Sequence, residues 1–200
     1  MQQNLFHNAK NILPYDGAAY FYPDYFSNAE GDSFLVSLIN EVNWKQEPIK
    51  MFGKEIMQPR LTAYCGDAAK PYSYSGITMQ PQSWTGSLLA IKTRIEWVAG
   101  VIFTSALLNF YRDGHDSMGW HRDNEKELGI NPVIASVSFG AARQFQYRDY
   151  TIKGAPISIN LTHGSLLLMK GKTQHCWEHR LPKALDITGI RINITFRLVM

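Results

Sequence analysis

The segment Ile190-Arg-Ile-Asn-Ile-Thr-Phe-Arg-Leu198 decides the fold, because apolar and polar residues alternate along its whole length. Successive side chains of an extended strand point to opposite faces, so one face of this segment is apolar and the other is polar. If the polar face meets solvent, the segment is an ordinary amphipathic edge strand. If that face lines the mouth of a double sheet, its two guanidinium groups converge on a small, doubly anionic ligand. The polar side chains are those of Arg191, Asn193, Thr195 and Arg197.

The rest of the C-terminal half shows the same two-residue period from Ser105 onward. A strand is expected over residues 107–112 and another over Ile157-Ser-Ile-Asn-Leu161, with turns such as Thr162-His-Gly164 between strands. Several short strands separated by turns favour a double sheet, and we predict a jelly-roll core, also called a double-stranded β-helix, over residues 101–200.

The N-terminal half, residues 1–100, has a helical period in two places. Residues 28–44 and 87–100 each place apolar side chains on one stripe, and Gly100 is positioned to end the second helix. We therefore predict an α+β protein in which two N-terminal helices pack outside the double sheet. The stripes consist of Phe34, Leu35, Leu38, Ile39 and Val42 in the first helix, and of Leu88, Leu89, Ile91, Ile95 and Val98 in the second.

Composition indicates one folded unit rather than a membrane, secreted or disordered chain. The 200 residues are 45% hydrophobic and 18% charged, with a net charge of +3 that is compatible with a polyanionic partner. No repeat or linker divides them, so we expect a single domain, residues 1–200, and a monomer. Two cysteines, Cys65 and Cys176, form no disulfide framework, and we interpret both as small buried hydrophobic residues.

No run of residues approaches the roughly 20 apolar residues that cross a bilayer. The first seventeen residues lack the charged and apolar regions of a secretion signal. We therefore expect no membrane association and an intracellular location, cytoplasmic in a bacterium and nuclear in a eukaryote.

A second motif, Trp120-His-Arg-Asp123, lies just beyond the expected strand over residues 107–112. On extended chain, His121 and Asp123 point the same way, and with a distant imidazole they form the two-histidine, one-carboxylate triad of non-heme iron(II) oxygenases. His175 and His179 are the candidates for the third ligand. They are separated by one helical turn or two strand periods, so spacing leaves both open.

The metal motif and the Arg-rich strand explain each other. Three protein ligands on one face of an octahedral iron leave three positions open, two for a chelating keto acid and one for dioxygen. The co-substrate 2-oxoglutarate chelates through its 1-carboxylate and 2-keto oxygens. Its far carboxylate then requires a buried cation, which an Arg on a neighbouring strand supplies.

The segment Asn109-Phe-Tyr-Arg-Asp-Gly-His-Asp-Ser-Met-Gly-Trp-His-Arg-Asp123 resembles the AlkB family motif that runs from an Asn-x-Tyr pair to the His-x-Asp ligands. The resemblance covers at least residues 51–199, with further blocks at compatible spacing. These blocks are Ile134-Ala-Ser-Val-Ser-Phe-Gly140, His163-Gly-Ser-Leu-Leu-Leu-Met169, His179-Arg-Leu-Pro182 and Arg191-Ile-Asn-Ile-Thr-Phe-Arg197.

The resemblance implies a role for each matching residue. It implies His121, Asp123 and His179 as ligands of Fe(II), with the block His179-Arg-Leu-Pro182 selecting His179 over His175. We interpret His115 and His163, which stand beside Gly in expected turns, as surface or structural histidines. The implied 2-oxoglutarate pocket consists of Asn109, Tyr111, Arg191, Asn193, Thr195 and Arg197.

Upstream, Met51-Phe-Gly-Lys54, residues 59–67 and Tyr72-Ser-Tyr-Ser-Gly76 resemble the nucleotide-recognition region of the animal, duplex-active DNA-repair members. The resemblance implies Phe52 as a finger that enters the duplex, and a pocket for the flipped base. The implied pocket residues are Tyr72, Tyr74, Ser75 and Glu125, and the candidates for backbone phosphates are Lys45, Lys50, Lys54 and Arg60.

The activity implied is direct-reversal DNA repair, in which O2 and 2-oxoglutarate are consumed to demethylate bases of the 1-methyladenine and 3-methylcytosine type. Succinate, carbon dioxide and formaldehyde are released. The alternatives are an RNA demethylase of the same chemistry, an inactive nucleic-acid-binding protein on this fold, and an oxygenase of proteins or small molecules. The complete metal motif opposes the second alternative, and the base-pocket resemblance opposes the third.

Overall fold

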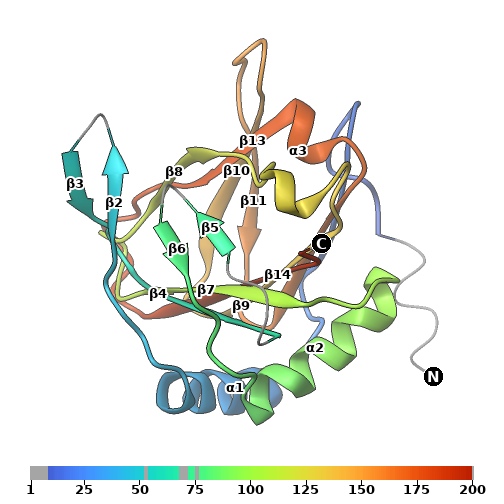
Figure 1. Cartoon of the computed structure of the whole chain (residues 1–200). Coiled ribbons are helices and arrows are strands. Elements are labelled where there is room, and N and C mark those ends of the chain that lie inside the picture. The colour runs from blue at the N-terminus through green and yellow to red at the C-terminus, as the bar shows by residue number, and fades with distance from the viewer. Residues whose placement is uncertain (1–8, 52–53, 68–71, 75–76, 200) are drawn as a thin grey trace.

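The computed structural model describes residues 9–51, 54–67, 72–74 and 77–199. Two antiparallel sheets face each other, and two helices lie beneath the larger sheet (Figure 1). This arrangement confirms the predicted α+β fold with a double sheet and external helices. None of the helices in these residues is long and apolar enough to cross a membrane.

The larger sheet has six strands, and β14, the last strand in the sequence, lies near its middle. Its order is β1 (Ala18–Tyr22), β12 (Ser165–Lys170), β9 (Ile134–Gly140), β14 (Arg191–Arg197), β7 (Ser105–Tyr111) and β4 (Leu61–Gly66). Because β9 and β7 flank it, β14 is not an edge strand, and all seven of its residues are buried.

The smaller sheet has four strands and covers the inner face of the larger one. Its order is β11 (Ile157–Leu161), β10 (Arg143–Asp149), β13 (Trp177–Leu181) and β8 (Met118–His121). A short helix, α3 (Thr173–Cys176), leads directly into β13, and a 3-10 turn, η1 (Lys126–Leu128), follows β8.

Two hairpins lie outside these sheets in the described chain. Strands β2 (Pro48–Met51) and β3 (Lys54–Met57) pair with each other, as do β5 (Tyr72–Tyr74) and β6 (Ile77–Met79). Figure 1 shows the β2/β3 hairpin projecting from the body of the protein.

The two faces of β14 belong to two different cores. Ile192, Ile194 and Phe196 are fully buried in the core between the larger sheet and the helices. The polar side chains therefore point between the sheets, where a second core contains Phe145 and Tyr147. The solvent-facing interpretation of the polar face is excluded, although Leu198, expected on the apolar face, lies beyond the strand and is 39% exposed.

The helices α1 (Asn28–Glu41) and α2 (Gly86–Ala99) begin close to where the sequence predicts. Ser27 caps α1 in a reciprocal capping box with Glu30, and Gly100 ends α2 in the left-handed conformation at φ 72°. The prediction of a first helix to residue 44 was three residues too long, because Val42 adopts extended backbone.

Two predictions about buried side chains were wrong. Leu89, expected on the buried stripe of α2, is 46% exposed. Cys65 is fully buried as expected, whereas Cys176 is only partly buried, and both are free thiols.

His163 attaches α1 to the larger sheet, which is the structural role expected for it. Its Nδ1 atom accepts a hydrogen bond from the backbone N–H of Gly140 (2.9 Å), and its Nε2 atom lies 3.3 Å from the carbonyl oxygen of Asn28. A side chain at Gly31 would occupy the position of the His163 ring. The helix therefore approaches the sheet only because residue 31 is a glycine.

We predict that Gly31→Ala destabilises the protein by about 1–3 kcal/mol, the range for overpacking a filled core. The measurement is the midpoint of denaturant unfolding. Gly86→Ala is the matched control, because nothing lies within 4 Å of a side chain added there. Equal midpoints for the two variants would show that His163 moves aside without cost.

Candidate active site

The buried polar face of β14 forms one wall of a cavity between the sheets. Arg191 pairs in register with Tyr111, and Asn193 pairs with Asn109, so the polar residues of two strands lie side by side. Arg191 Nη2 donates to Ser138 Oγ (2.9 Å), and its guanidinium carbon lies 5.2 Å from the centre of the Tyr111 ring. Burial lowers the pKa of Arg191 to about 10, so it remains a cation at neutral pH.

The middle of this wall is a chain of neutral hydrogen bonds. Asn193 Nδ2 donates to Ser136 Oγ (2.8 Å) and to the carbonyl oxygen of Val137 (3.0 Å). Thr195 Oγ1 donates to Asn193 Oδ1 (3.2 Å). These bonds fix the orientation of the polar groups before any ligand is present.

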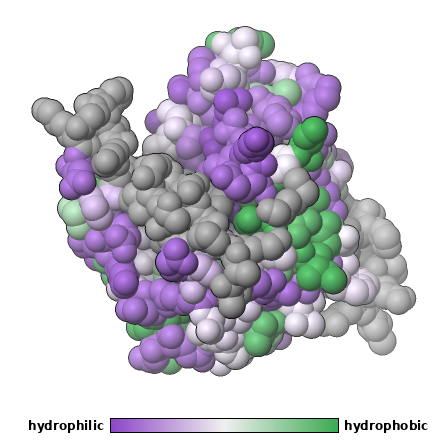
Figure 2. All heavy atoms as spheres, viewed as in Figure 1, coloured by the Kyte–Doolittle hydropathy of each residue, from purple (hydrophilic) through white to green (hydrophobic). Residues whose placement is uncertain are grey.

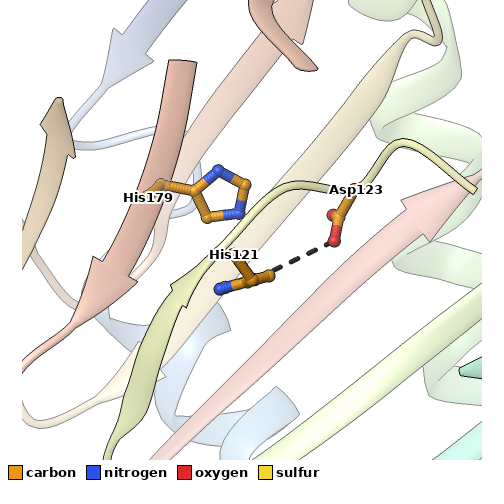
Figure 3. A group of neighbouring side chains, drawn as sticks. All are labelled: His121, Asp123 and His179. Atoms are coloured by element: carbon orange, nitrogen blue, oxygen red, sulfur yellow. Dashed lines mark ion pairs between the residues drawn. The ribbon is translucent and has the colours of Figure 1, made fainter. Parts of the chain in front are cut away.

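The opposite wall, from the smaller sheet, brings two imidazoles and a carboxylate together. His121 on β8 pairs directly with His179 on β13, and their ring centres lie 4.3 Å apart. Asp123 follows β8, and its Oδ1 atom is 3.9 Å from His121 Nε2. One ligand atom from each residue lies within 4.8 Å of the other two, and Figure 3 shows the three side chains converging.

Asp123 is held at two points that leave one carboxylate oxygen available. Arg197 Nη2 donates to Asp123 Oδ2 (2.8 Å), and both side chains are nearly inaccessible to solvent. Gln174 Oε1 accepts the backbone N–H of Asp123 (3.0 Å). Asp123 Oδ1 is buried and has no hydrogen-bond partner among the described residues, as expected of an oxygen that serves a metal ion.

The protonation states of the cluster suit metal binding. Burial, with the charge of His121 adding to it, lowers the pKa of His179 to about 3, and burial also lowers the pKa of His121. Burial opposes ionisation of Asp123, but the charges of Arg197 and the imidazoles outweigh it and lower its pKa. At neutral pH the cluster therefore offers two neutral imidazoles and one carboxylate, the forms that bind a metal.

Hydrogen bonding also orients His121. Its Nδ1 atom lies 2.9 Å from the carbonyl oxygen of Gly119, which only accepts, so Nδ1 carries the proton and Nε2 presents a lone pair. The competing candidate, His175, is exposed on α3 and does not belong to the cluster.

All nine residues expected to bind iron or 2-oxoglutarate line this one cavity. The sequence did not assign a role to Ser136, which lines the cavity, to Ser138, which accepts a hydrogen bond from Arg191, or to Gln174, which accepts one from the backbone of Asp123. The available signal for the two serines was their spacing of two residues on β9, because residues at this spacing share a strand face. The apolar lining consists of Leu107, Met118, Phe145, Leu161, Met169 and Leu181.

The residues expected to contact nucleic acid are less completely placed. Arg60, a candidate for a backbone phosphate, is only 4% exposed, and its Nε atom donates to Asn109 Oδ1 (2.6 Å). A buried guanidinium engaged in this way does not reach a phosphate, so the phosphate assignment is corrected to support of Asn109. Lys45 is exposed, and Glu125 is half-buried at the start of η1.

The remaining expected contacts fall where the structure gives no side-chain position. Tyr72 and Tyr74 lie on β5, with only their backbone described. The side chains of Lys50 and Lys54 are likewise not described, and Phe52 and Ser75 lie outside the described residues.

Two facing antiparallel sheets that enclose a two-histidine, one-carboxylate cluster define the class of non-heme iron(II) oxygenases. The model of the 2OG-Fe(II) oxygenase superfamily matches residues 18–197. Together with the relatives described next, this match shows that the chain belongs to the AlkB family of that superfamily, whose members use Fe(II) and 2-oxoglutarate.

The alkB homolog 3 of Rattus norvegicus, an alpha-ketoglutarate-dependent dioxygenase, is 44% identical over 89% of this chain and 63% of its own length. The DNA oxidative demethylase ALKBH2 of Homo sapiens is 38% identical over 88% of this chain and 71% of its own length. The chain thus spans less than two thirds of the first relative. The solved structure of OsALKBH1 is similar in fold, with a TM-score of 0.65 at 18% identity over 90% of this chain and 97% of that one.

We predict that His121→Ala, Asp123→Ala and His179→Ala each abolish high-affinity binding of Co(II), used as a spectroscopic substitute for Fe(II). Loss of one of three ligands removes a bond and the geometry together. His175→Ala is the control and should bind Co(II) like the parent protein. Strong binding by His179→Ala with loss in His175→Ala would reverse the ligand assignment.

Proposed function

We propose that this protein demethylates alkylated nucleic-acid bases by oxidation, with DNA lesions of the 1-methyladenine and 3-methylcytosine type as substrates. The observation that carries the proposal is the single cavity in which His121, Asp123 and His179 face the buried cation Arg191. A metal ligand set and a cationic anchor across one enclosed space suit a chelating dianion between them.

The residues present fit Fe(II). Two imidazoles and a carboxylate are the donor set of non-heme iron oxygenases, and the buried, unpaired Asp123 Oδ1 marks where an ion would satisfy it. When bound, iron with dioxygen and 2-oxoglutarate supplies the oxidising power that hydroxylates an N-methyl group. The hydroxymethyl group then leaves as formaldehyde and restores the base.

The two arginines have different positions and so different proposed roles. Arg197 donates a hydrogen bond to Asp123, so its guanidinium lies at the metal-ligand end of the cavity, where it would hold the chelating end of 2-oxoglutarate. Arg191 bonds Ser138 and stacks near Tyr111, and we assign it the far carboxylate. Asn109, Asn193 and Thr195 lie between these ends as neutral hydrogen-bonding groups that orient the co-substrate.

The substrate assignment rests on chemistry and on similarity. A 1-methyladenine or 3-methylcytosine base is cationic and has lost Watson-Crick pairing, so it costs less to flip than a normal base. Glu125, half-buried two residues after Asp123, offers a carboxylate to such a ring. The relatives named as a DNA oxidative demethylase and as alkB homolog 3 support this class of substrate.

RNA is the second candidate polymer. The residues that would distinguish a duplex from a single strand are those expected in the nucleotide-recognition region. Phe52 as a duplex finger and Tyr72, Tyr74 and Ser75 around the base stay predictions. A finger residue matters for a duplex and not for a single strand, where little stacking must be broken.

A product assay tests the proposal. The oligonucleotides contain 1-methyladenine or 3-methylcytosine and are incubated with Fe(II), ascorbate and 2-oxoglutarate. Because demethylation replaces a methyl group by hydrogen, each repaired lesion should lower the mass by ~14 Da and release one equivalent of formaldehyde. Matched duplex DNA, single-stranded DNA and RNA are compared. Turnover of RNA alone would change the polymer, and turnover of none would refute the proposal.

We predict that Arg191→Lys weakens the apparent affinity for 2-oxoglutarate tenfold or more, about 1.4 kcal/mol per decade, because a point charge does not reproduce a two-pronged donor. Arg197→Lys should weaken both 2-oxoglutarate and metal binding, since it also loses its fit to Asp123. Arg180→Lys, on the outer face beside Trp120, is the control. Unchanged 2-oxoglutarate KM values in both cavity variants would contradict these roles.

A further inference from the structure

Tyr147 is a buried tyrosine beside the candidate metal ligands, and the proposed reaction assigns it no role. It lies on β10, pairs in register with His179 on β13, and is fully inaccessible to solvent. Its ring centre is 6.0 Å from that of His179, with the rings edge to face. The Tyr147 hydroxyl has no hydrogen-bond partner among the described residues.

An unpaired hydroxyl in a protein interior destabilises the fold by about 1–3 kcal/mol. A phenylalanine would fill nearly the same space without this cost. The residue two positions away on the same strand face is a phenylalanine, Phe145. The hydroxyl of Tyr147 therefore needs a partner that the described side chains and backbone groups do not supply.

The two histidines of the cluster differ in what holds their second nitrogen. In His121 that nitrogen, Nδ1, donates to the carbonyl of Gly119. In His179 the Nδ1 atom is buried and unpaired among the described residues, and Figure 3 shows one ring nitrogen pointing toward Asp123 and the other away from it. Metal-binding histidines almost always donate their second N–H to a partner, which fixes the ring and raises its basicity.

We propose that Tyr147 is a positioning residue for the metal centre. When a metal is bound to Nε2 of His179, the Nδ1–H of that residue donates a hydrogen bond to one ordered water, which in turn donates to the Tyr147 hydroxyl. Two buried polar atoms on paired strands that make no direct hydrogen bond are the setting in which a bridging water is expected. The proposal rests on the role of His179 as a metal ligand.

Burial keeps the phenol neutral under all ordinary conditions. It raises the pKa of Tyr147 far above its usual value, and the charge of Asp123 raises it further. The oxygen therefore remains an acceptor of the water's hydrogen bond, and its own proton stays available as a donor inside the cluster.

Tyr147→Phe tests the proposal by titration with Co(II) alone, followed by its visible absorption. Loss of such an outer partner typically weakens metal binding on the order of 10- to 100-fold, and that loss is expected here. The melting temperature of the metal-free variant should be equal to or above that of the parent, because the unpaired hydroxyl is gone. Weaker metal binding without lower stability is what a merely structural tyrosine would not produce.

Tyr25→Phe is the matched control, since it removes another buried hydroxyl, one that donates to the carbonyl of Arg94 (2.7 Å) far from the cluster. It should lower stability and leave Co(II) affinity unchanged, the opposite of Tyr147→Phe. Proton NMR of the Co(II)-loaded protein gives a second readout. The exchangeable imidazole N–H signal of His179, assigned by its loss in His179→Ala, should exchange faster with solvent in Tyr147→Phe.

The outcomes separate the two levels of the argument. If His179→Ala binds Co(II) like the parent, the ligand assignment itself fails. If His179→Ala loses binding while Tyr147→Phe retains parental affinity, only the positioning role fails. A lower melting temperature for metal-free Tyr147→Phe would also overturn it, because the hydroxyl would then have a partner within the fold.

Discussion

The ion pair between Arg197 and Asp123 joins the last strand of the larger sheet to the chain that leaves the smaller one. Both side chains are nearly inaccessible to solvent, at 3% and 2% exposure. Two charges in such a place are tolerated only as a pair, because removing one partner leaves an uncompensated buried charge at a cost of about 3–5 kcal/mol. The spacing of the sheets is therefore tied to this contact. The cavity between them, with His121 and His179 on one wall and Arg191 on the other, follows from it.

The same contact sets the electrostatics of the cavity. Arg191 and Arg197 contribute two positive charges to its lining and Asp123 one negative charge, while burial keeps both imidazoles neutral. A divalent metal adds to an environment that is already positive, so metal alone is less favourable there than metal together with a dianion. A chelating dicarboxylate compensates the excess at both ends at once. Metal and co-substrate thus favour each other's binding, a coupling that is reciprocal by thermodynamic necessity.

The sequence predicted most of this cavity because its residues lie on strands with a strict two-residue period. Alternation assigned Arg191, Asn193, Thr195 and Arg197 to one face, but it did not say whether that face meets solvent, since this depends on β9 and β7 flanking β14. Arg60 was misplaced for a similar reason: its partner Asn109 is 49 residues away, and no local pattern distinguishes a buried Arg from an exposed one. Tyr147 carried no signal at all, because a tyrosine in an alternating strand is typical of an apolar core.

The polymer preference is separable from the cavity in physical terms. The β2/β3 and β5/β6 hairpins pair only within themselves among the described strands. The residues that flank them, Lys45 before β2 and Gln82 after β6, form isolated bridges with Thr62 and Cys65 on the edge strand β4. Figure 2 shows hydrophilic residues over much of the described surface of this face, beside a hydrophobic patch on its right. Because the hairpins share no ladder with β14, their residues can change without altering the Arg197–Asp123 contact. The cavity therefore sets the metal and co-substrate site that the family shares, and the proposed preference for a polymer would depend on side chains that the cavity does not constrain.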